Sequence, residues 1–551
     1  MTTRKLTLVL LLALVALLAP ASLFAATTRY MVVTRGPAQN ARLRVIANSA
    51  ESIEHRVRTF AHAGSFAADL TDDEAAALRR SPDVESVHPL VRIHALELGP
   101  AAGLALDYTK QLMPWGVEAI HAPAVWPVTR GASVNVAVID SGIDMTHPDL
   151  VAAYRGGYND IDREKPPLDD HGHGTHVAGI IGATDNTTGV VGVAPAVNLW
   201  AVKVLASDGS GTDENLVAGL DWVVAKKNEI GGAWVVNMSI GATDGTPAVE
   251  RAVQRAIDAR IIVVAASGND GSGYLNYPAA YGGVIAVGAV DSNLAIAEFS
   301  TYGPGLNVVA PGVDVPSSVA RGKFTLTEVE ASNQTLPGYA VAGSPKASLN
   351  LPFVNCGYGR PEDYPTHVAG RIAVVQRGPI GPNAIPFGEK ARNAKDAGAA
   401  GVIIYNDDDI GRPDYTRWTL LAQPEWADFQ FPLTIAMSHE DGVKVLGASG
   451  PITETYRFID YGRLSGTSMA TPHVTGTVAL MLALAPADIN PATIQWVLEH
   501  STIDVHLEGW DYRSAWGMVD ALAAAKLIAP SAFGLPDEPL PPPARRRAAR
   551  P

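Results

Sequence analysis

An aspartate, a histidine and a serine each lie in a short segment whose context suits hydrolysis of a peptide bond. Asp140 ends the run Val-Ala-Val-Ile-Asp, His173 opens the segment His-Gly-Thr-His-Val-Ala-Gly, and Ser468 is the third residue of Gly-Thr-Ser-Met-Ala-Thr-Pro-His. A serine hydroxyl is a poor nucleophile at neutral pH unless a base takes its proton during the attack. We therefore expect Ser468 to be the nucleophile and His173 the general base, later the general acid. Asp140 would orient the imidazole and stabilise its protonated form.

The order of these residues and a nearby amide narrow the class further. The order Asp, His, Ser distinguishes this set from triads on other folds. Asn269, in Ala-Ser-Gly-Asn, supplies a side-chain N–H, and the backbone N–H of Ser468 at a helix start supplies a second donor for a developing oxyanion. At these four places the chain resembles the subtilisin-like serine peptidases. The resemblance implies an endopeptidase that works through an acyl-enzyme intermediate.

Protein or peptide substrates would bind as an added strand, because exposed backbone edges pair with extended peptides of many sequences. The resemblance implies two edge segments that flank the substrate and one residue at the base of the primary side-chain pocket, namely Ser210, Gly211, Thr212, Ser239, Ile240, Gly241 and Asn276. Asp270 lies beside that pocket. This polar pair argues against a strict preference for large apolar side chains and leaves a preference for polar or basic ones open.

The same resemblance implies a structural calcium site, whose positions here are Gln111, Asp149, Thr184, Asn186, Thr188 and Val190. Carboxylate, amide and backbone carbonyl oxygens are the ligands that Ca²⁺ selects. The alternative is an ordinary turn rich in Asn, Thr and Gly. We expect Ca²⁺ and no organic cofactor. An ion bound by the folded state alone would stabilise a chain whose single cysteine, Cys356, permits no intramolecular disulfide.

Two segments precede the catalytic pattern. Residues 1–26 combine basic residues, a short apolar run and a small-residue cleavage site, as secretory signal peptides do. Residues 27–100 resemble the family's inhibitory propeptide, with short strands around a helix that begins at the capping box Thr71-Asp-Asp-Glu74. The stretch from Leu96 to about Tyr108 is interpreted as a processing linker. We therefore expect a secreted zymogen that its own propeptide inhibits and that processes itself. The alternative for residues 27–100 is an α+β domain with no regulatory role.

The rest of the chain predicts a subtilisin-like α/β fold with a doubly wound parallel sheet and helices on both faces. Near-continuous apolar runs predict strands buried on both faces, and amphipathic stretches separate them. Strands are expected at 134–139, 199–205, 234–240, 261–266 and 284–290, and helices at 216–227 and 248–259. We assign residues 108–320 and 456–528 to the peptidase domain. The block 321–455, a β-rich α+β domain, resembles the protease-associated domain inserted in large relatives, and residues 529–551 are expected to form a disordered tail.

The composition argues against several partners. The chain has 551 residues and a net charge of −14, which disfavours nucleic acid. After the first apolar run, no stretch approaches the roughly 18 uninterrupted apolar residues of a membrane helix. We therefore expect no membrane span in the mature form, and we expect a monomer.

Three rival interpretations were weighed against the peptidase. His171, His173 and His176 could form a metal cluster, but the intervening glycines and the lack of a His-Glu-x-x-His motif argue against zinc. A serine esterase or lipase would carry Gly-x-Ser-x-Gly and the order Ser, Asp, His, whereas Ala470 stands two residues after Ser468. A degenerate fold that acts as a binding scaffold should have lost a catalytic residue, and the triad and Asn269 are all present.

Overall fold

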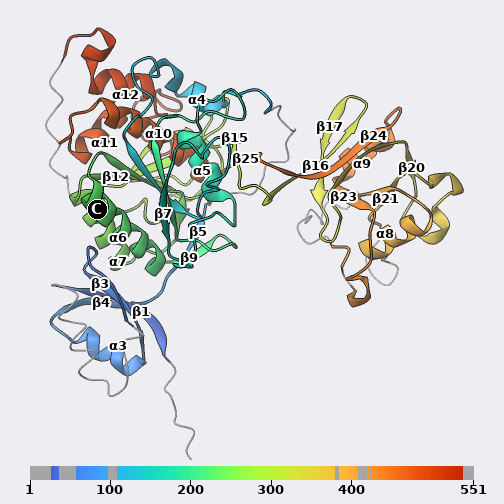
Figure 1. The fold of residues 1–551 in the computed structure, drawn as a ribbon, viewed down its shortest axis with the longest axis horizontal. Helices are drawn as coiled ribbons and strands as arrows, with labels where there is room; N and C mark the ends of the chain where they lie inside the picture. The colour runs from blue at the N-terminus through green and yellow to red at the C-terminus, as the bar shows by residue number, and fades with distance from the viewer. Residues whose placement is uncertain are drawn as a thin grey trace, which may run out of the picture.

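A peptidase unit lies between two smaller units, one near the N-terminus and one inserted late in the chain (Figure 1). The structure is a computed structural model that describes residues 27–35, 57–96, 108–378, 384–407, 419–421 and 423–537. The predicted signal peptide and the stretch 97–107 of the predicted linker lie outside these ranges. No helix among the described residues is both long enough and apolar enough to cross a membrane.

The centre of the peptidase unit is a seven-stranded sheet in which all neighbouring strands are parallel. Its order is β14 (Leu306–Pro311), β13 (Ile285–Val290), β12 (Ile261–Ala266), β10 (Trp234–Met238), β6 (Asn135–Asp140), β8 (Asn198–Lys203) and β7 (Tyr154–Asn159). Every residue of β6, β10, β12, β13 and β14 is buried, as expected for strands covered on both faces. The predicted parallel α/β fold is confirmed.

Helices cover both faces of this sheet. The first face packs against α5 (His173–Gly182), α10 (Thr467–Leu484), α11 (Pro491–Glu499) and α12 (Ala521–Ile528). The second face packs against α6 (Asp213–Ile230) and α7 (Pro247–Asp258). The order of strands reverses around β6, so its carboxyl end, where Asp140 lies, is the place where α/β folds open a crevice for ligands.

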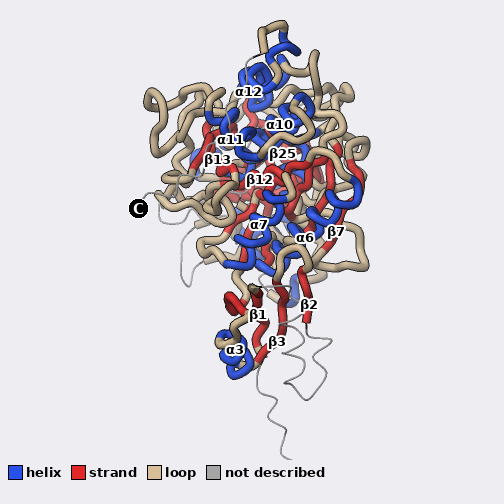
Figure 2. Tube along the Cα trace, turned by 90° about the vertical axis from the view of Figure 1, so that its left-hand side faces the viewer, coloured by secondary structure: helices blue, strands red, loops and turns tan. Residues whose placement is uncertain are grey.

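The N-terminal unit is a four-stranded antiparallel sheet with one helix. Its strands are β1 (Thr28–Thr34), β2 (Val57–Phe60), β3 (Ser65–Leu70) and β4 (Val84–Pro89), and its helix is α3 (Asp72–Arg79). The predicted capping box is present: the Thr71 side chain accepts from the Glu74 N–H, and the Glu74 carboxylate accepts from the Thr71 N–H. The sheet lies against α6 and α7, and Met31, Val33 and Phe60 share one buried cluster with those helices (Figure 2).

The inserted unit contains two sheets. One is antiparallel and consists of β17 (Gln334–Pro337), β16 (Phe324–Ala331), β24 (Ile452–Ile459) and β19 (Ala347–Leu351). The other consists of β18 (Tyr339–Ala340), β23 (Leu433–Met437), β22 (Gly401–Tyr405), β21 (Ile372–Gln376) and β20 (Phe353–Asn355), with α8 (Phe387–Asp396) and α9 (His439–Leu446) beside it. Each unit buries an apolar cluster of its own.

A two-stranded ribbon joins the insert to the peptidase unit. Within the peptidase unit, β15 (Val315–Ser318) pairs with β25 (Tyr461–Leu464), and beyond it β16 pairs with β24 (Figure 1). The chain therefore leaves and re-enters the peptidase unit at adjacent positions, Ser318 and Tyr461.

Three expected boundaries need correction. The strand expected at 234–240 is divided, because β10 ends at Met238 and β11 (Ile240–Gly241) joins a different sheet. Strand β24 continues to Ile459, past the expected end of the insert at residue 455, because it keeps its pairing with β16. The expected tail starts too early: α12 is followed by a 3-10 helix, Pro530–Phe533, whose Phe533 packs against the core. Residues 538–551 lie outside the described ranges.

Candidate active site

Asp140 and His173 meet at the carboxyl end of β6. Asp140 is the last residue of that strand, and His173 is the first residue of α5, so the strand and the helix bring the two side chains together. Asp140 Oδ1 lies 2.8 Å from His173 Nδ1 and accepts from the Ser141 N–H at 2.7 Å, and both side chains are fully buried. A carboxylate on Nδ1 keeps the proton on that nitrogen and leaves Nε2 as the basic atom.

The Ser468 hydroxyl lies at the N-terminus of the buried helix α10. Gly466, with φ 148°, precedes the helix in a conformation that favours glycine. Ser468 Oγ donates to the backbone oxygen of Ser239 at 2.8 Å, and Ser239 Oγ donates to the Ser468 carbonyl oxygen at 2.9 Å. These two bonds connect the start of α10 to the segment between β10 and β11.

The amide of Asn269 has one orientation that satisfies its neighbours. Its Oδ1 accepts from the Thr467 N–H at 2.9 Å and from the Thr467 hydroxyl at 2.8 Å. Because a backbone N–H can only donate, this contact fixes Oδ1 and turns Nδ2 the other way. Nδ2 is buried and has no hydrogen-bond partner among the residues that the structure describes. A buried unpaired donor beside a helix N-terminus is suited to receive an oxyanion.

A segment of the chain itself lies in the cleft beside these residues. Strand β5 (Arg92–Ala95), which follows the N-terminal unit, sits between β9 (Ser210–Thr212) and β11 in a three-stranded antiparallel sheet. Ile93 pairs with Gly211 and His94 with Gly241. The structure thus brings the two predicted edge segments to opposite sides of one extended peptide, and β5 itself was not among the expected strands.

Leu96, directly after β5, contacts the segment between β10 and β11 that also holds the candidate nucleophile. Its N–H donates to the Ser239 carbonyl oxygen at 3.3 Å, the oxygen that also accepts from Ser468 Oγ. Its side chain lies against Gly241, where an added Cβ would be 2.7 Å from Leu96 Cδ1. The side chain of Ile93 is buried, with 3% of its surface exposed. The peptide therefore presents Leu96 and Ile93 to the peptidase unit.

The two polar residues expected at the primary pocket occupy different settings. The Asn276 side chain lies beside Gly268, at about 3 Å from the position of an added Cβ, and the backbone N–H of Asn276 donates to the backbone oxygen of Ser267. Asp270 is exposed at the surface, and its Oδ1 accepts from the Thr301 hydroxyl at 2.5 Å. Burial alone would raise the pKa of Asp270, but hydrogen bonds from Thr301 and Ser272 lower it overall.

The six residues of the expected calcium site form one loop cluster. The Gln111 amide donates to the carbonyl oxygens of Thr184 at 3.0 Å and Val190 at 3.4 Å, so these two oxygens face one point. The Asp149 carboxylate accepts from Asn186 Nδ2 and from the Val190 N–H, each at 2.9 Å. Reversing the Gln111 amide would turn its oxygen toward the Thr184 and Val190 oxygens, and these oxygens with the Asp149 carboxylate are the kind of ligand that Ca²⁺ selects. Thr188 belongs to the same loop, and its N–H donates to Asn186 Oδ1.

The neighbouring histidines serve other contacts. His176 Nε2 lies 3.0 Å from the Val315 oxygen, and burial lowers the pKa of His176 to about 3. His473 Nδ1 lies 2.8 Å from the Met469 oxygen, and burial lowers its pKa to about 4. Among the residues that the structure describes, no group of three or more His, Cys, Asp or Glu side chains is placed to hold a metal ion. Burial also raises the pKa of the Cys356 thiol to about 12, which suits an inert side chain.

Comparison with known proteins identifies the family. The subtilase family model matches residues 131–342 and 440–517, which is more than half of the chain. The chain belongs to the subtilase family. The PA domain model matches residues 339–442, and the peptidase inhibitor I9 model matches residues 29–94. The N-terminal unit is therefore called the propeptide below, and the inserted unit the PA insert.

Relatives within the subtilase family match mainly the peptidase unit. Subtilisin Savinase from Lederbergia lenta is 47% identical over 268 residues, covering 48% of this chain and 85% of the relative. An alkaline protease from Shouchella clausii is 40% identical over 291 residues, covering 52% of this chain and 66% of the relative, just under two thirds of its length. The crystal structure of the psychrophilic subtilisin-like protease Apa1 from Pseudoalteromonas sp. AS-11 is 28% identical with a TM-score of 0.52, covering 78% of this chain and all of that one.

Proposed function

We propose that this subtilase is a secreted serine endopeptidase that cuts itself out of a zymogen. In the reaction, the Ser468 hydroxyl turns from the Ser239 oxygen toward His173 and attacks the substrate carbonyl. His173 takes the proton and later gives it to the leaving amine, while Asp140 stabilises the imidazolium. Water then hydrolyses the acyl-enzyme. Secretion is inferred from residues 1–26.

Asn269 supports the tetrahedral intermediate in this proposal. Its unpaired Nδ2 and the backbone N–H of Ser468 donate to the oxyanion. The orientation of the amide is fixed by Thr467 before substrate arrives, so no reorganisation is needed when charge develops. Ser210–Thr212 and Ser239–Gly241 hold substrate by backbone pairing, as they hold β5 here.

The observation that carries the proposal is the position of Leu96. A residue whose N–H bonds to the Ser239 oxygen has its own carbonyl carbon two bonds further along the chain, and the Ser468 hydroxyl bonds to that same oxygen. The bond after Leu96 is therefore the self-cleavage site, and the mature chain begins at Glu97. Since Leu96 and the buried Ile93 occupy the side-chain positions of the cleft, we infer a preference for apolar residues at the cleaved position and three residues before it, rather than for polar or basic ones.

Calcium has a structural role in the proposal. Gln111, Asp149, Asn186 and the backbone oxygens of Thr184, Thr188 and Val190 would hold the ion. Bound Ca²⁺ would neutralise the buried Asp149 carboxylate and connect the loop after α5 to the start of the peptidase unit. The reaction at Ser468 does not pass through it.

The test is the intact mass and N-terminal sequence of the secreted protein. Wild type should begin at Glu97 without residues 1–96, and Ser468→Ala should retain the propeptide. Ser531→Ala, which changes an exposed serine, is the matched control and should process as wild type does. A wild-type protein that stays full length would contradict the proposed activity. If Ser468→Ala also loses its propeptide, another protease makes the cut. A mature chain that begins elsewhere would keep the activity but refute the position of Leu96.

A further inference from the structure

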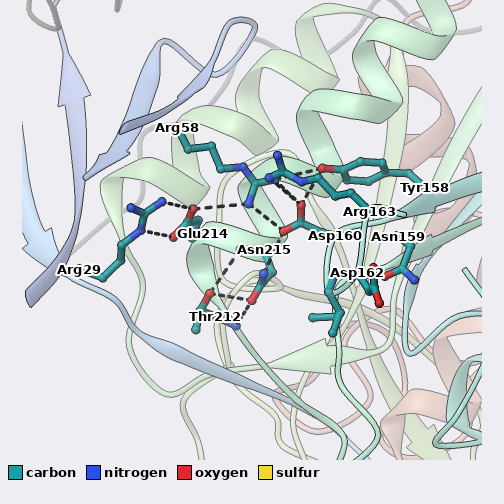
Figure 3. A network of polar contacts seen from close by, with 11 residues as sticks. Arg29, Arg58, Tyr158, Asn159, Asp160, Asp162, Arg163, Thr212, Glu214 and Asn215 are labelled. Atoms are coloured by element: carbon teal, nitrogen blue, oxygen red, sulfur yellow. Dashed lines mark hydrogen bonds and ion pairs between the residues drawn. The ribbon is translucent and has the colours of Figure 1, made fainter. Parts of the chain in front are cut away.

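Besides the apolar face and strand β5, the propeptide contacts the peptidase unit where two arginines meet two carboxylates (Figure 3). Arg29 donates to Glu214 through Nε at 2.9 Å and through Nη2 at 2.8 Å. Arg58 Nη1 donates to Asp160 at 3.0 Å and to Glu214 at 3.4 Å, and Arg58 Nη2 donates to the Tyr158 hydroxyl at 3.0 Å and also contacts Asp160. The arginines come from strands β1 and β2, and their partners come from the peptidase unit. We call this set the arginine clamp.

The peptidase side of the clamp is also held by hydrogen bonds within the peptidase unit itself. The Tyr158 hydroxyl donates to Asp160 Oδ1 at 2.6 Å, and Asn215 Nδ2 donates to Asp160 Oδ2 at 2.9 Å. The Asn215 oxygen in turn accepts from the Thr212 N–H at 2.9 Å and from its hydroxyl at 2.7 Å. Thr212 ends β9, so hydrogen bonds run from the clamp to an edge of the substrate cleft (Figure 3).

Burial makes these contacts stronger than ordinary surface ion pairs. The Asp160 side chain is fully buried, and 18% of the Arg58 side chain is exposed. Burial by itself would raise the pKa of the Asp160 carboxyl, but the hydrogen bonds and charge of Arg58 lower the pKa overall. A paired charge in such a place binds well, whereas removing one partner leaves the other buried without compensation.

The clamp differs from the cleft in what it recognises. Strand β5 is held largely by backbone bonds that any extended peptide can make, so a substrate competes with the cleaved propeptide there. The carboxylates of the clamp bind two guanidinium groups on the folded surface of the propeptide. This place lies outside the cleft, so a substrate peptide in the cleft does not compete for it.

We propose that the arginine clamp, with Arg58 at its centre, is the latch that keeps the cleaved propeptide on the mature peptidase and sets how slowly activity appears. This inference rests on the proposed self-cleavage, because only a cut propeptide needs a latch. The cut frees the end of β5, and substrate can then displace that strand. The propeptide leaves when the clamp opens.

The experiment follows two events in the full chain: the cut, by gel, and the appearance of activity, with a short chromogenic peptide. Arg58→Ala should cut at the wild-type rate, and its activity should appear roughly tenfold sooner or more. Arg58 lies in the segment that is removed, so the mature enzyme is identical to wild type and the final activity should match. Arg80→Ala, at the exposed end of α3, is the control and should keep the wild-type delay.

The outcomes separate this inference from the proposed function. If wild type is not cut, the proposed function fails first, and the latch fails with it. If Arg58→Ala is cut normally and the delay does not change, the latch is wrong while the endopeptidase stands. If Arg58→Ala does not fold, Arg58→Lys keeps the charge but loses the forked contact, and a delay equal to that of wild type would overturn the inference.

Discussion

The propeptide and the PA insert are both attached to the peptidase unit, but in different ways (Figure 1). The propeptide covers α6 and α7 with an apolar face, reaches the cleft with β5 and adds the arginine clamp. The PA insert is joined through the ribbon of β15 with β25 and of β16 with β24. The propeptide binds across a broad surface and has a single covalent connection to the peptidase unit. The PA insert has two covalent connections to it, at adjacent positions.

This difference shows which unit can regulate by leaving. A bound segment with one connection becomes a separate molecule after one cut, so its residence is a matter of affinity. A segment with two connections stays attached to the peptidase unit after a single cut. Any effect of the PA insert on the candidate active site must therefore pass through the ribbon. Phe324, the first residue of β16, lies against Gly172, directly before His173, so that route exists.

The difference between the propeptide and the PA insert is tested most strongly by a variant that slows cleavage of the propeptide. Asn269→Ala removes the unpaired Nδ2 donor, so cleavage of the propeptide and hydrolysis of a peptide substrate should both slow by about 10²–10³-fold. Melting of the PA insert should not change. Kinetics on a chromogenic peptide and the half-time of processing measure the two rates. Asn293→Ala, in an exposed turn, is the matched control. A loss below threefold would show that Asn269 does not serve the oxyanion.

Calcium removal should act on the peptidase unit and spare the PA insert. In excess chelator, the half-life of the mature enzyme on heating should fall roughly tenfold or more, because an ion that binds only the folded state no longer stabilises it. Asp149→Asn should have the same short half-life with calcium present and should not respond to chelator. Asp488→Asn, which changes an exposed carboxylate, should behave as wild type. A half-life that chelator leaves unchanged in wild type would count against the site.

Deleting the PA insert tests whether its two connections are needed for catalysis. Residues 326–457 can be replaced by Asn-Gly, because Thr325 and Phe458 are partners across the ribbon and a two-residue turn closes such a pair. Processing and kcat/KM on a short peptide should stay within about threefold of wild type, since Phe324 remains. Phe324→Ala in the full chain should cost more than the deletion. The reverse order would mean that the body of the insert supports the catalytic histidine.

The smallest expected effect is a pH dependence confined to the PA insert. Glu454 lies fully buried between the two sheets, and burial raises its pKa well above the usual value. Stability from this group is complete below the unfolded value of about 4.5 and falls as the pH rises, because the unfolded carboxyl ionises first. In a Ser468→Ala background, Glu454→Gln should slow hydrogen exchange in β21–β23 at pH 8 and change little at pH 4. Glu330→Gln, exposed on the same sheet, should do neither.

Much of the fold could be predicted because its signals are local. Near-continuous apolar runs predicted β12 and β13 within one residue, and Thr71 with Glu74 predicted the capping box of α3. The sequence also indicated Asp140 and His173 as partners, and their side chains meet at 2.8 Å. Their roles in catalysis, like those of Ser468 and Asn269, stay predictions.

The remaining features depend on partners distant in the sequence. Strand β5 has only four residues, so its alternation of polar and apolar side chains is a weak signal, and it is held because β9 and β11 bond to its two sides. Arg58 and Asp160 are 102 positions apart, and nothing near either residue indicates the other. The first residues of the expected tail are ordered because Phe533 finds a place on the core, which composition alone does not reveal.

Strand β5 has a further consequence for the precursor while it folds. Without β5, strands β9 and β11 would each present unpaired backbone groups, and open β-edges of this kind recruit strands from other chains. A strand supplied from the same polypeptide is always present at high local concentration and fills the gap before a foreign chain can. The precursor thus protects itself from association with its own copies, and it gives up that protection only when a folded enzyme can cut any strand that enters the gap.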